Sequence, residues 1–495
     1  ADKVAEAQKA KQEAEFKEKA AKKEQEIAEQ RKLAASMSKK KVAPSRKPAP
    51  LKQASGEPKS PAELALPRPF VAQAISLMAE VLKFERPADS VLSYHFKNHR
   101  EMGHADRGRI AELVYGILRH LRSLRDVVAR SEPPSPSEAR YLVLAALVRL
   151  QGKNLREIEH LIKGEDTEWF GRLKAAGQEK GTPATRHEFP DWLETALSAM
   201  PADELDTLSR SLLVPAPLDL RINPLHARRP EILAQLEKHG IAAKETPFSP
   251  WGMRLEGKPA IQRHPAFVKG DMEVQDEGSQ LLAALVAPKR GEMVLDFCAG
   301  AGGKTLLMGA LMKNTGRLYA ADISEKRLAK LGPRVARAGL SNVQTIRLAH
   351  ERDDRIQRLA GKFDRVLVDA PCSGTGTLRR NPDLKWRQGE AQIAELTELQ
   401  AKILEAAAPL VRPGGVLVYA TCSLLPQENT LIQQAFSDAH PEFEVVDPVA
   451  QLTAVGIELP ADALIAGPTN LPGLQLLPHR HGTDGFFAAI WRKKI

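Results

Sequence analysis

Cysteine is scarce in this sequence, and long apolar runs are missing from it. The chain has 495 residues and three cysteines, Cys298, Cys372 and Cys422. So small and odd a number argues against a disulfide framework and favours a reducing compartment, so we expect a cytoplasmic protein. Their spacing matches neither a cysteine-ligated metal site nor a Cys-x-x-Cys redox motif, so we expect no metal. No apolar run approaches the roughly 18–20 residues of a membrane helix, and the N-terminus has no signal-peptide core, so we expect no membrane partner.

The net charge of +10 suggests a polyanionic partner, but most of this charge belongs to one segment. Residues 1–60 contain 16 lysines and arginines against 9 acidic residues, whereas the remaining 435 residues contain 56 against 53. We predict that residues 1–62 form a charged tail and linker, as a solvated helix or a disordered segment. Such a tail either has no specific role or tethers RNA non-specifically. The folded part is only mildly basic, so a nucleic-acid partner must be inferred from its chemistry.

The apolar pattern predicts two units before the C-terminal half. Residues 63–170 are predicted to be an all-helical bundle, with apolar residues at helical spacing over 110–124 and a second helix over 141–150. Residues 171–284 are predicted to contain connecting helices and a small α+β RNA-binding unit. Its signals are an alternating strand over 218–222, a helix over 230–239, and short strands at 254–256 and 272–274.

Residues 285–495 are predicted to form a doubly wound, Rossmann-like α/β domain. Short β-rich runs alternate with helical segments, which is the pattern of parallel strands joined by helices. Ligands bind such sheets outside the carboxyl ends of the strands, where this sequence places its glycine-rich and cysteine-containing turns. The five predicted strands cover residues 293–296, 317–322, 343–348, 365–369 and 416–420.

A glycine-rich turn follows the first of these strands. Residues 296–305 have neither the spacing of a Walker loop nor that of a dinucleotide-binding turn. Asp322 ends the second strand, where a carboxylate can accept hydrogen bonds from both hydroxyls of a ribose. A nucleoside site without a phosphate cradle indicates S-adenosylmethionine; alternatively, Asp322 only caps the next helix. The predicted cofactor contacts in the turn are Cys298, Ala299, Gly300, Ala301, Gly302, Gly303 and Lys304.

Cys372 and Cys422 follow the ends of the fourth and fifth predicted strands. A thiolate can add to carbon 6 of cytosine, which makes carbon 5 electron-rich enough to accept a methyl group. Either cysteine alone could be a small buried residue, but two at matching strand ends beside a nucleoside site favour catalysis. Asp369 is expected to contact the cofactor and to hydrogen-bond N3 and the amino group of the base, unless it caps the turn that follows.

These motifs resemble the Nop/Sun family of RNA cytosine-C5 methyltransferases over roughly residues 215–495. The resemblance implies that Cys422, in Thr-Cys-Ser, is the nucleophile and that Cys372, in Pro-Cys, helps to release the product. The helical part, through residues 106–109 and 114–119, resembles the NusB-type RNA-binding domain. That domain occurs in the RsmB-like branch of the family, which acts on small-subunit ribosomal RNA. The segments that carry the family resemblance are 275–280, 296–305, 369–376, 380–386, 421–423 and 484–487.

Two positions depart from the family pattern. Gly300-Ala301 replaces the usual Ala-Pro of the first loop, and His350 stands where the family often has an aspartate that meets the adenine. His350 could donate to an adenine nitrogen or stack on the ring. A flipped-base site is predicted after the Cys372 turn, with arginines on phosphates and an aromatic wall, although the aromatic could equally be a packing residue. Its candidate residues are Arg379, Arg380, Lys385 and Trp386.

We therefore predict a multidomain, monomeric enzyme that transfers a methyl group from S-adenosylmethionine to carbon 5 of a cytosine in RNA, with 16S ribosomal RNA as the expected target. Two alternatives remain open. One is a methyltransferase acting on tRNA or another RNA with Cys372 as the nucleophile, as in the DNA cytosine methyltransferases. The other is a non-catalytic RNA-binding assembly factor, against which the intact cysteines and Asp322 argue.

Overall fold

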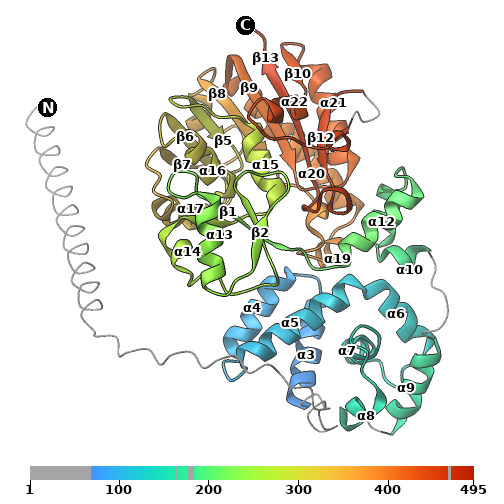
Figure 1. The fold of residues 1–495 in the computed structure, drawn as a ribbon. Helices are drawn as coiled ribbons and strands as arrows, with labels where there is room; N and C mark the ends of the chain where they lie inside the picture. The colour runs from blue at the N-terminus through green and yellow to red at the C-terminus, as the bar shows by residue number, and fades with distance from the viewer. Residues whose placement is uncertain (1–67, 162–163, 177–182, 466–469) are drawn as a thin grey trace, which may run out of the picture. The chain divides into compact units, whose positions relative to one another are not determined.

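The computed structural model describes residues 68–161, 164–176, 183–465 and 470–495 (Figure 1). The predicted tail over residues 1–62 lies outside these ranges. Within them, no helix is both long and apolar enough to cross a membrane, and no three histidine, cysteine or acidic side chains are arranged to hold a metal ion. The described chain forms a helical bundle, a four-stranded unit and a nine-stranded sheet, which confirms the predicted multidomain class.

The helical bundle is arranged around α7 (Glu138–Arg149). All residues from 141 to 147 are buried, so this helix is apolar on every side and belongs at the centre of a bundle. Figure 1 shows it end-on among its neighbours. These are α3 (Arg68–Val81), α4 (Ala88–Asn98), α5 (His104–Arg119), α6 (Leu121–Arg130), α8 (Leu155–Ile158), the 3-10 helix η1 (Glu159–Leu161) and α9 (Glu165–Ala176).

One prediction about this bundle is corrected. The spacing over residues 110–124 predicts one helix, but the structure has two, α5 and α6, which meet at His120. The φ of −109° and ψ of 25° at His120 leave the helical region, although its N–H still bonds to the carbonyls of Gly116 and Ile117. Because the chain changes direction there, both helices pack against α7.

A four-stranded antiparallel unit follows three connecting helices. Its sheet has the order β2-β3-β1-β4, and its core contains Leu220, Ile222, Ile232, Leu236 and Met253. The predicted α+β unit is confirmed, with the strand expected at 254–256 starting earlier. The elements are α10 (Pro183–His187), α11 (Asp191–Ala196), α12 (Ala202–Leu212), β1 (Leu218–Ile222), α13 (Arg229–Lys238), β2 (Ala243–Glu245), β3 (Gly252–Leu255), α14 (Pro265–Lys269) and β4 (Met272–Val274).

The C-terminal part is a nine-stranded sheet of order β11-β12-β13-β9-β8-β5-β6-β7, with β10 paired to β13. β5 to β9 are parallel, as predicted. β13 runs antiparallel to β9 and was missed, because a short apolar run does not by itself distinguish a strand from a helix. The strands are β5 (Met293–Asp296), β6 (Arg317–Asp322), β7 (Val343–Arg347), β8 (Phe363–Asp369), β9 (Val411–Thr421), β10 (Phe443–Val446), β11 (Leu464–Ile465), β12 (Gly473–Leu476) and β13 (Phe486–Lys493).

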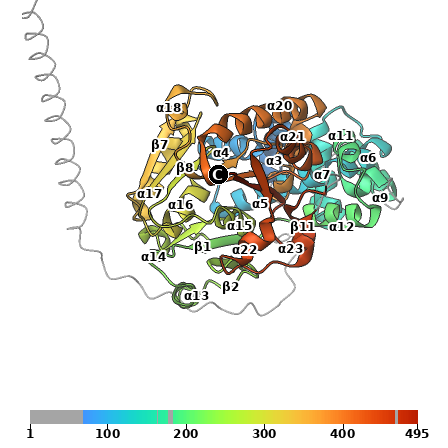
Figure 2. The same cartoon turned by 90° about the horizontal axis from the view of Figure 1, so that it is seen from above.

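Helices cover both faces of this sheet. One face packs against α15, α16 and α22, and the opposite face packs against α20 and α21; Figure 2 shows the two groups on either side. The limit predicted between residues 284 and 285 falls inside α15. The predicted domain bounds stay predictions. The elements are α15 (Glu277–Leu285), α16 (Gly303–Leu311), α17 (Glu325–Arg337), α18 (Asp354–Gln357), η2 (Thr375–Thr377), α19 (Leu384–Arg387), α20 (Glu390–Ala407), η3 (Ala408–Leu410), η4 (Pro426–Glu428), α21 (Thr430–Ala439), α22 (Pro448–Thr453), η5 (Ala461–Ala463) and α23 (Pro478–His481).

The order of the strands reverses between β5 and β8. From β5 the chain continues outward to β6 and β7, and it later returns to build β8 and β9 on the other side. Such a switch point leaves a crevice beyond the carboxyl ends of the strands. The ends of β5, β6, β8 and β9 bring Asp296, Asp322, Asp369 and Thr421 to this edge, so motifs that are distant in the sequence meet there.

Candidate active site

A cavity of about 810 Å³ lies at the carboxyl edge of the sheet. The two predicted catalytic cysteines, Cys372 and Cys422, both face it. Gly302 is the one predicted cofactor residue that does not line it. The predicted residues that do are Cys298, Ala299, Gly300, Ala301, Gly303, Lys304, Asp322, His350 and Asp369.

The glycine-rich turn wraps one side of this cavity. Gly300 and Gly302 have φ values of 56° and 84°, in the left-handed region that favours glycine. A Cβ at Gly302 would lie 2.0 Å from a methyl group of Leu331, so close packing as well as backbone conformation requires glycine there. Gly302 also precedes α16 as its N-cap. Its role is therefore to shape the turn, while its neighbours face the cavity.

Asp322 is held in place by two backbone amides. Its Oδ2 accepts from the N–H of Gly300 at 2.8 Å, and its Oδ1 accepts from the N–H of Ser324 at 2.7 Å. The next helix, α17, is capped by the side chain of Ser324 instead, which accepts from the N–H of Arg327. Asp322 lines the cavity, and each of its oxygens can accept a further hydrogen bond. Asp322 is therefore not the helix cap, and it has the acceptors that ribose hydroxyls need.

Lys304 and Asp369 form an ion pair inside the cavity. The Nζ of Lys304, in the first turn of α16, donates to Oδ2 of Asp369 at 2.6 Å. Burial alone would lower the pKa of Lys304, but the Asp369 carboxylate outweighs it and the pKa is raised. Lys304 therefore stays charged near pH 7, and Asp369 lines the cavity with Lys304 as its side-chain partner.

The two catalytic candidates are in contact. The Sγ atoms of Cys372 and Cys422 lie 3.4 Å apart, because β8 and β9 pair side by side with Asp369 opposite Ala420. The contact with Cys422, together with burial, raises the pKa of Cys372 well above its usual range. Burial also raises the pKa of Cys298. Cys372 and Cys298 are therefore neutral thiols near pH 7.

Sequence reasoning missed part of the cavity wall. Ile323 follows Asp322 directly, lines the cavity and is 64% exposed. An exposed aliphatic side chain beside a ribose acceptor offers an apolar surface to a purine ring. Arg327 and Lys330, from α17, line the same wall. The signal for Ile323 was available: it is an apolar residue placed directly after an acidic strand end.

Lys385 and Trp386 do not reach the cavity, which corrects the flipped-base prediction for both. Trp386 packs against the core of the helical bundle and donates from Nε1 to the carbonyl of Leu118 at 2.8 Å. The Nζ of Lys385 donates to the carbonyls of Arg119 and Glu188 at 3.1 and 2.6 Å, and the residue is 3% exposed. Both side chains make contacts that hold α19 against neighbouring elements, including the helical bundle. The packing interpretation of Trp386 therefore fits the structure.

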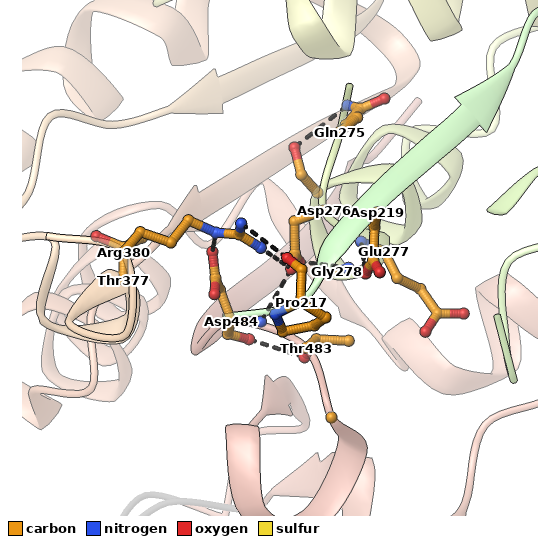
Figure 3. A network of polar contacts seen from close by, with 12 residues as sticks. Pro217, Asp219, Gln275, Asp276, Glu277, Gly278, Thr377, Arg380, Thr483 and Asp484 are labelled. Atoms are coloured by element: carbon orange, nitrogen blue, oxygen red, sulfur yellow. Dashed lines mark hydrogen bonds and ion pairs between the residues drawn. The ribbon is translucent and has the colours of Figure 1, made fainter. Parts of the chain in front are cut away.

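Arg380 is held in a network of buried carboxylates, shown in Figure 3. Its guanidinium donates to Asp484 at 2.5 Å, to Asp276 at 2.9 Å and to the carbonyl of Pro217 at 3.1 Å. Burial raises the pKa of Asp484 to about 7 and also raises that of Asp276. By contrast, the Nε of Arg379 has no hydrogen-bond partner among the described residues. Arg380 therefore anchors its loop. The unpartnered Nε of Arg379 is buried, and neither arginine lines the cavity.

Comparison with known proteins identifies related chains. The family model for the 16S rRNA methyltransferase RsmB/F matches residues 283–492, and a model for the RsmF/B-like ferredoxin-like domain matches residues 189–262. A probable ribosomal RNA small subunit methyltransferase B from Synechocystis is 33% identical over 423 residues, which cover 78% of this chain and 91% of the relative. The ribosomal RNA small subunit methyltransferase B of Yersinia pseudotuberculosis is 34% identical over 452 residues, covering 86% and 98%.

A solved structure agrees with these relatives. The crystal structure of a methyltransferase homolog protein from Pyrococcus horikoshii is 28% identical, covers 63% of this chain and 97% of its own, and superposes with a TM-score of 0.54. The lining of the cavity is compatible with S-adenosylmethionine. It includes the carboxylate of Asp322, the aliphatic side chain of Ile323 and the glycine-rich turn at Gly300. On its sequence identity, its domain order and this cofactor site, the chain belongs to the RsmB/F family of S-adenosylmethionine-dependent methyltransferases.

Proposed function

We propose that this chain methylates carbon 5 of a cytosine in small-subunit ribosomal RNA, with Cys422 as the nucleophile. The observation that carries the proposal is the contact of Cys422 with Cys372, at 3.4 Å, within the cavity that also holds Asp322. A thiol alone at a strand end would be an ordinary buried residue. Two thiols in contact beside a nucleoside site suit a covalent addition followed by an elimination.

The residues on one side of the cavity would bind and orient S-adenosylmethionine. S-adenosylmethionine, when bound, supplies an electrophilic methyl group. Asp322 would accept from the ribose hydroxyls, and the backbone around Gly300, which lines the cavity, would hold the nucleoside part. His350 is exposed on the cavity wall, and its Nδ1 accepts from the N–H of Arg352 at 3.2 Å. That contact leaves Nε2 of His350 to donate to an adenine nitrogen.

The base side of the cavity activates cytosine. The carboxylate of Asp369 accepts from the amino group of cytosine and, once N3 is protonated, from N3–H, while Lys304 donates to Oδ2 of the same carboxylate and holds it in place. The Cys422 thiolate forms a bond to carbon 6 and displaces an electron pair toward carbon 5. That pair would bond to the methyl carbon as the bond between this carbon and the cofactor's sulfonium sulfur breaks, with its electrons going to the sulfur. Water or another base removes the carbon 5 proton. The electrons of that C–H bond restore the double bond as the C6–S bond breaks, and Cys422 leaves as a thiolate.

The division of roles between the cysteines has a physical basis. Contact with Cys422 and burial raise the pKa of Cys372, so Cys372 carries a proton near pH 7. From 3.4 Å it can donate a hydrogen bond to the departing sulfur of Cys422 and so assist elimination.

The RNA target is inferred from the relatives. The two relatives are named as small-subunit ribosomal RNA methyltransferases, which favours ribosomal RNA in the cytoplasm over tRNA. Arg379, which is partly exposed, is the proposed phosphate contact. The charged residues 1–62 would add a non-specific tether.

A trapping experiment tests the proposal. RNA carrying 5-fluorocytosine cannot lose its carbon 5 substituent as a proton, so the covalent adduct persists. We expect an adduct with the wild type and with Cys372→Ala, and none with Cys422→Ala. An adduct that survives Cys422→Ala but is lost in Cys372→Ala would reverse the roles. If the wild type forms no adduct and transfers no methyl group to RNA, the alternative of a non-catalytic RNA-binding factor holds.

A further inference from the structure

A buried carboxylate lies behind the two cysteine turns. Glu428, the last residue of η4, is 0% exposed and does not line the cavity. Its Oε1 accepts from the backbone N–H of Ser373 at 2.8 Å and from Nε2 of Gln400 at 2.9 Å. Its Oε2 accepts from the hydroxyls of Ser373 and Ser423. Ser373 follows Cys372 and Ser423 follows Cys422, so one side chain binds the residue after each cysteine.

Further contacts close this arrangement into a network. The hydroxyls of Ser373 and Ser423 lie 3.2 Å apart, and Thr375 is within 3.3 Å of both. Gln400 donates a second bond, to the carbonyl of Pro371 at 2.9 Å, just before Cys372. The residues before and after Cys372, and the residue after Cys422, are therefore all hydrogen-bonded to Glu428, either directly or through Gln400.

The carboxyl group of Glu428 is held by these four neutral donors. Among the described residues, no lysine or arginine forms an ion pair with it. Both oxygens of this buried carboxyl group accept two hydrogen bonds each. Replacing one oxygen by an amide NH₂ group would leave donors facing a donor, so the contacts that join the two turns would weaken.

We propose that Glu428 is a positioning residue that sets the separation of the two cysteine sulfur atoms. It acts through Ser373 and Ser423 and touches neither substrate nor cofactor. The expected effect on turnover rests on the proposed function. The expected effect on the separation of the thiols does not, because crosslinking is measured without RNA. A displacement of about 1 Å at a reacting group can cost about 100-fold in rate, so small shifts at these turns matter.

The test compares Glu428→Gln with Glu292→Gln. Glu292 is also a mostly buried carboxylate held by several donors, but it pairs with Arg365 at the opposite edge of the sheet. The first readout is the rate at which diamide, a two-electron oxidant of thiols, joins Cys372 to Cys422. The second is the split between kcat and the KM for S-adenosylmethionine in methyl transfer to RNA.

We expect Glu428→Gln to lower the crosslinking rate and kcat by about 10- to 100-fold, with the KM for S-adenosylmethionine within about twofold of the wild type. Glu292→Gln should match the wild type in both. Wild-type crosslinking and kcat in a folded Glu428→Gln protein would overturn the inference. If Glu428→Gln fails to fold, Ser423→Ala removes one contact and should show the same direction of change. If the wild type never methylates RNA, the proposed function is refuted. If Glu428→Gln nevertheless slows crosslinking in that case, the positioning role still holds.

Discussion

The Sγ atoms of Cys372 and Cys422 lie 3.4 Å apart, although 50 positions separate the two residues in the sequence. The pairing of β8 with β9 produces this contact, since each cysteine lies shortly beyond the end of its strand. Contact with Cys422, with burial, keeps Cys372 protonated by raising its pKa. The predictions below follow from this pair and from the residues around it.

The contact between the thiols predicts selective oxidation. A disulfide needs a sulfur separation of about 2.05 Å, so Cys372 and Cys422 must move only slightly to bond. We expect diamide to form this disulfide and to abolish methyl transfer, with recovery on adding a thiol reductant. The disulfide is measured by mass spectrometry after alkylation of the remaining thiols. Cys298 is the internal control, because no other thiol contacts it among the described residues. Equal oxidation of all three cysteines would contradict the geometry.

Removing the proton donor should stall the enzyme after methylation. In Cys372→Ser the hydroxyl is a weaker acid than the thiol, so elimination of Cys422 should slow. We expect a covalent complex with unmodified RNA to accumulate in the presence of S-adenosylmethionine, visible as a shifted band on a denaturing gel. The double variant Cys372→Ser/Cys422→Ala should show no such band. A Cys372→Ser enzyme with full turnover and no complex would show that Cys372 has no part in release.

Asp322 should govern cofactor affinity more than chemistry. Hydrogen bonds to a charged acceptor contribute about 1.5–3 kcal/mol each, which corresponds to roughly 10- to 100-fold in affinity. We expect Asp322→Ala to raise the dissociation constant for S-adenosylmethionine by at least about tenfold, as measured by calorimetry. Ser324→Ala is the matched control, because it removes the cap of α17 and leaves the carboxylate. Equal losses in both variants would mean that Asp322 only supports the turn.

Lys385 makes stability depend on pH. Burial lowers the pKa of Lys385 to about 7 in the folded protein, whereas an unfolded lysine has a pKa of about 10.4. Between these values the unfolded chain binds more protons than the folded chain, so the free energy of unfolding contributed by this group rises with pH. We expect the stability of the wild type relative to Lys385→Met to increase from pH 7 to pH 10 in urea unfolding. A difference that stays constant over this range would mean that Lys385 remains charged when buried.

Local pattern alone predicted much of the fold. Strands β5 to β9 and their parallel arrangement follow from β-rich runs that alternate with helical segments, because such periodicity is a property of neighbouring residues. The helix pattern over residues 110–124 was real, but its break at His120 was not predicted, because the apolar spacing continues through the break. Strand β13 was missed for a related reason: its apolar run carries no period that separates strand from helix.

The sequence by itself determined which residues could perform the chemistry, since strand ends, glycine-rich turns and cysteines are visible in order along the chain. Only the tertiary structure decided which of them meet. It brought Cys372 against Cys422 and Lys304 against Asp369, and it turned Lys385 and Trp386 away, into the helical bundle. The physical reason is that these contacts join residues 50 to 268 positions apart, and their energy depends on burial and packing that no local pattern specifies.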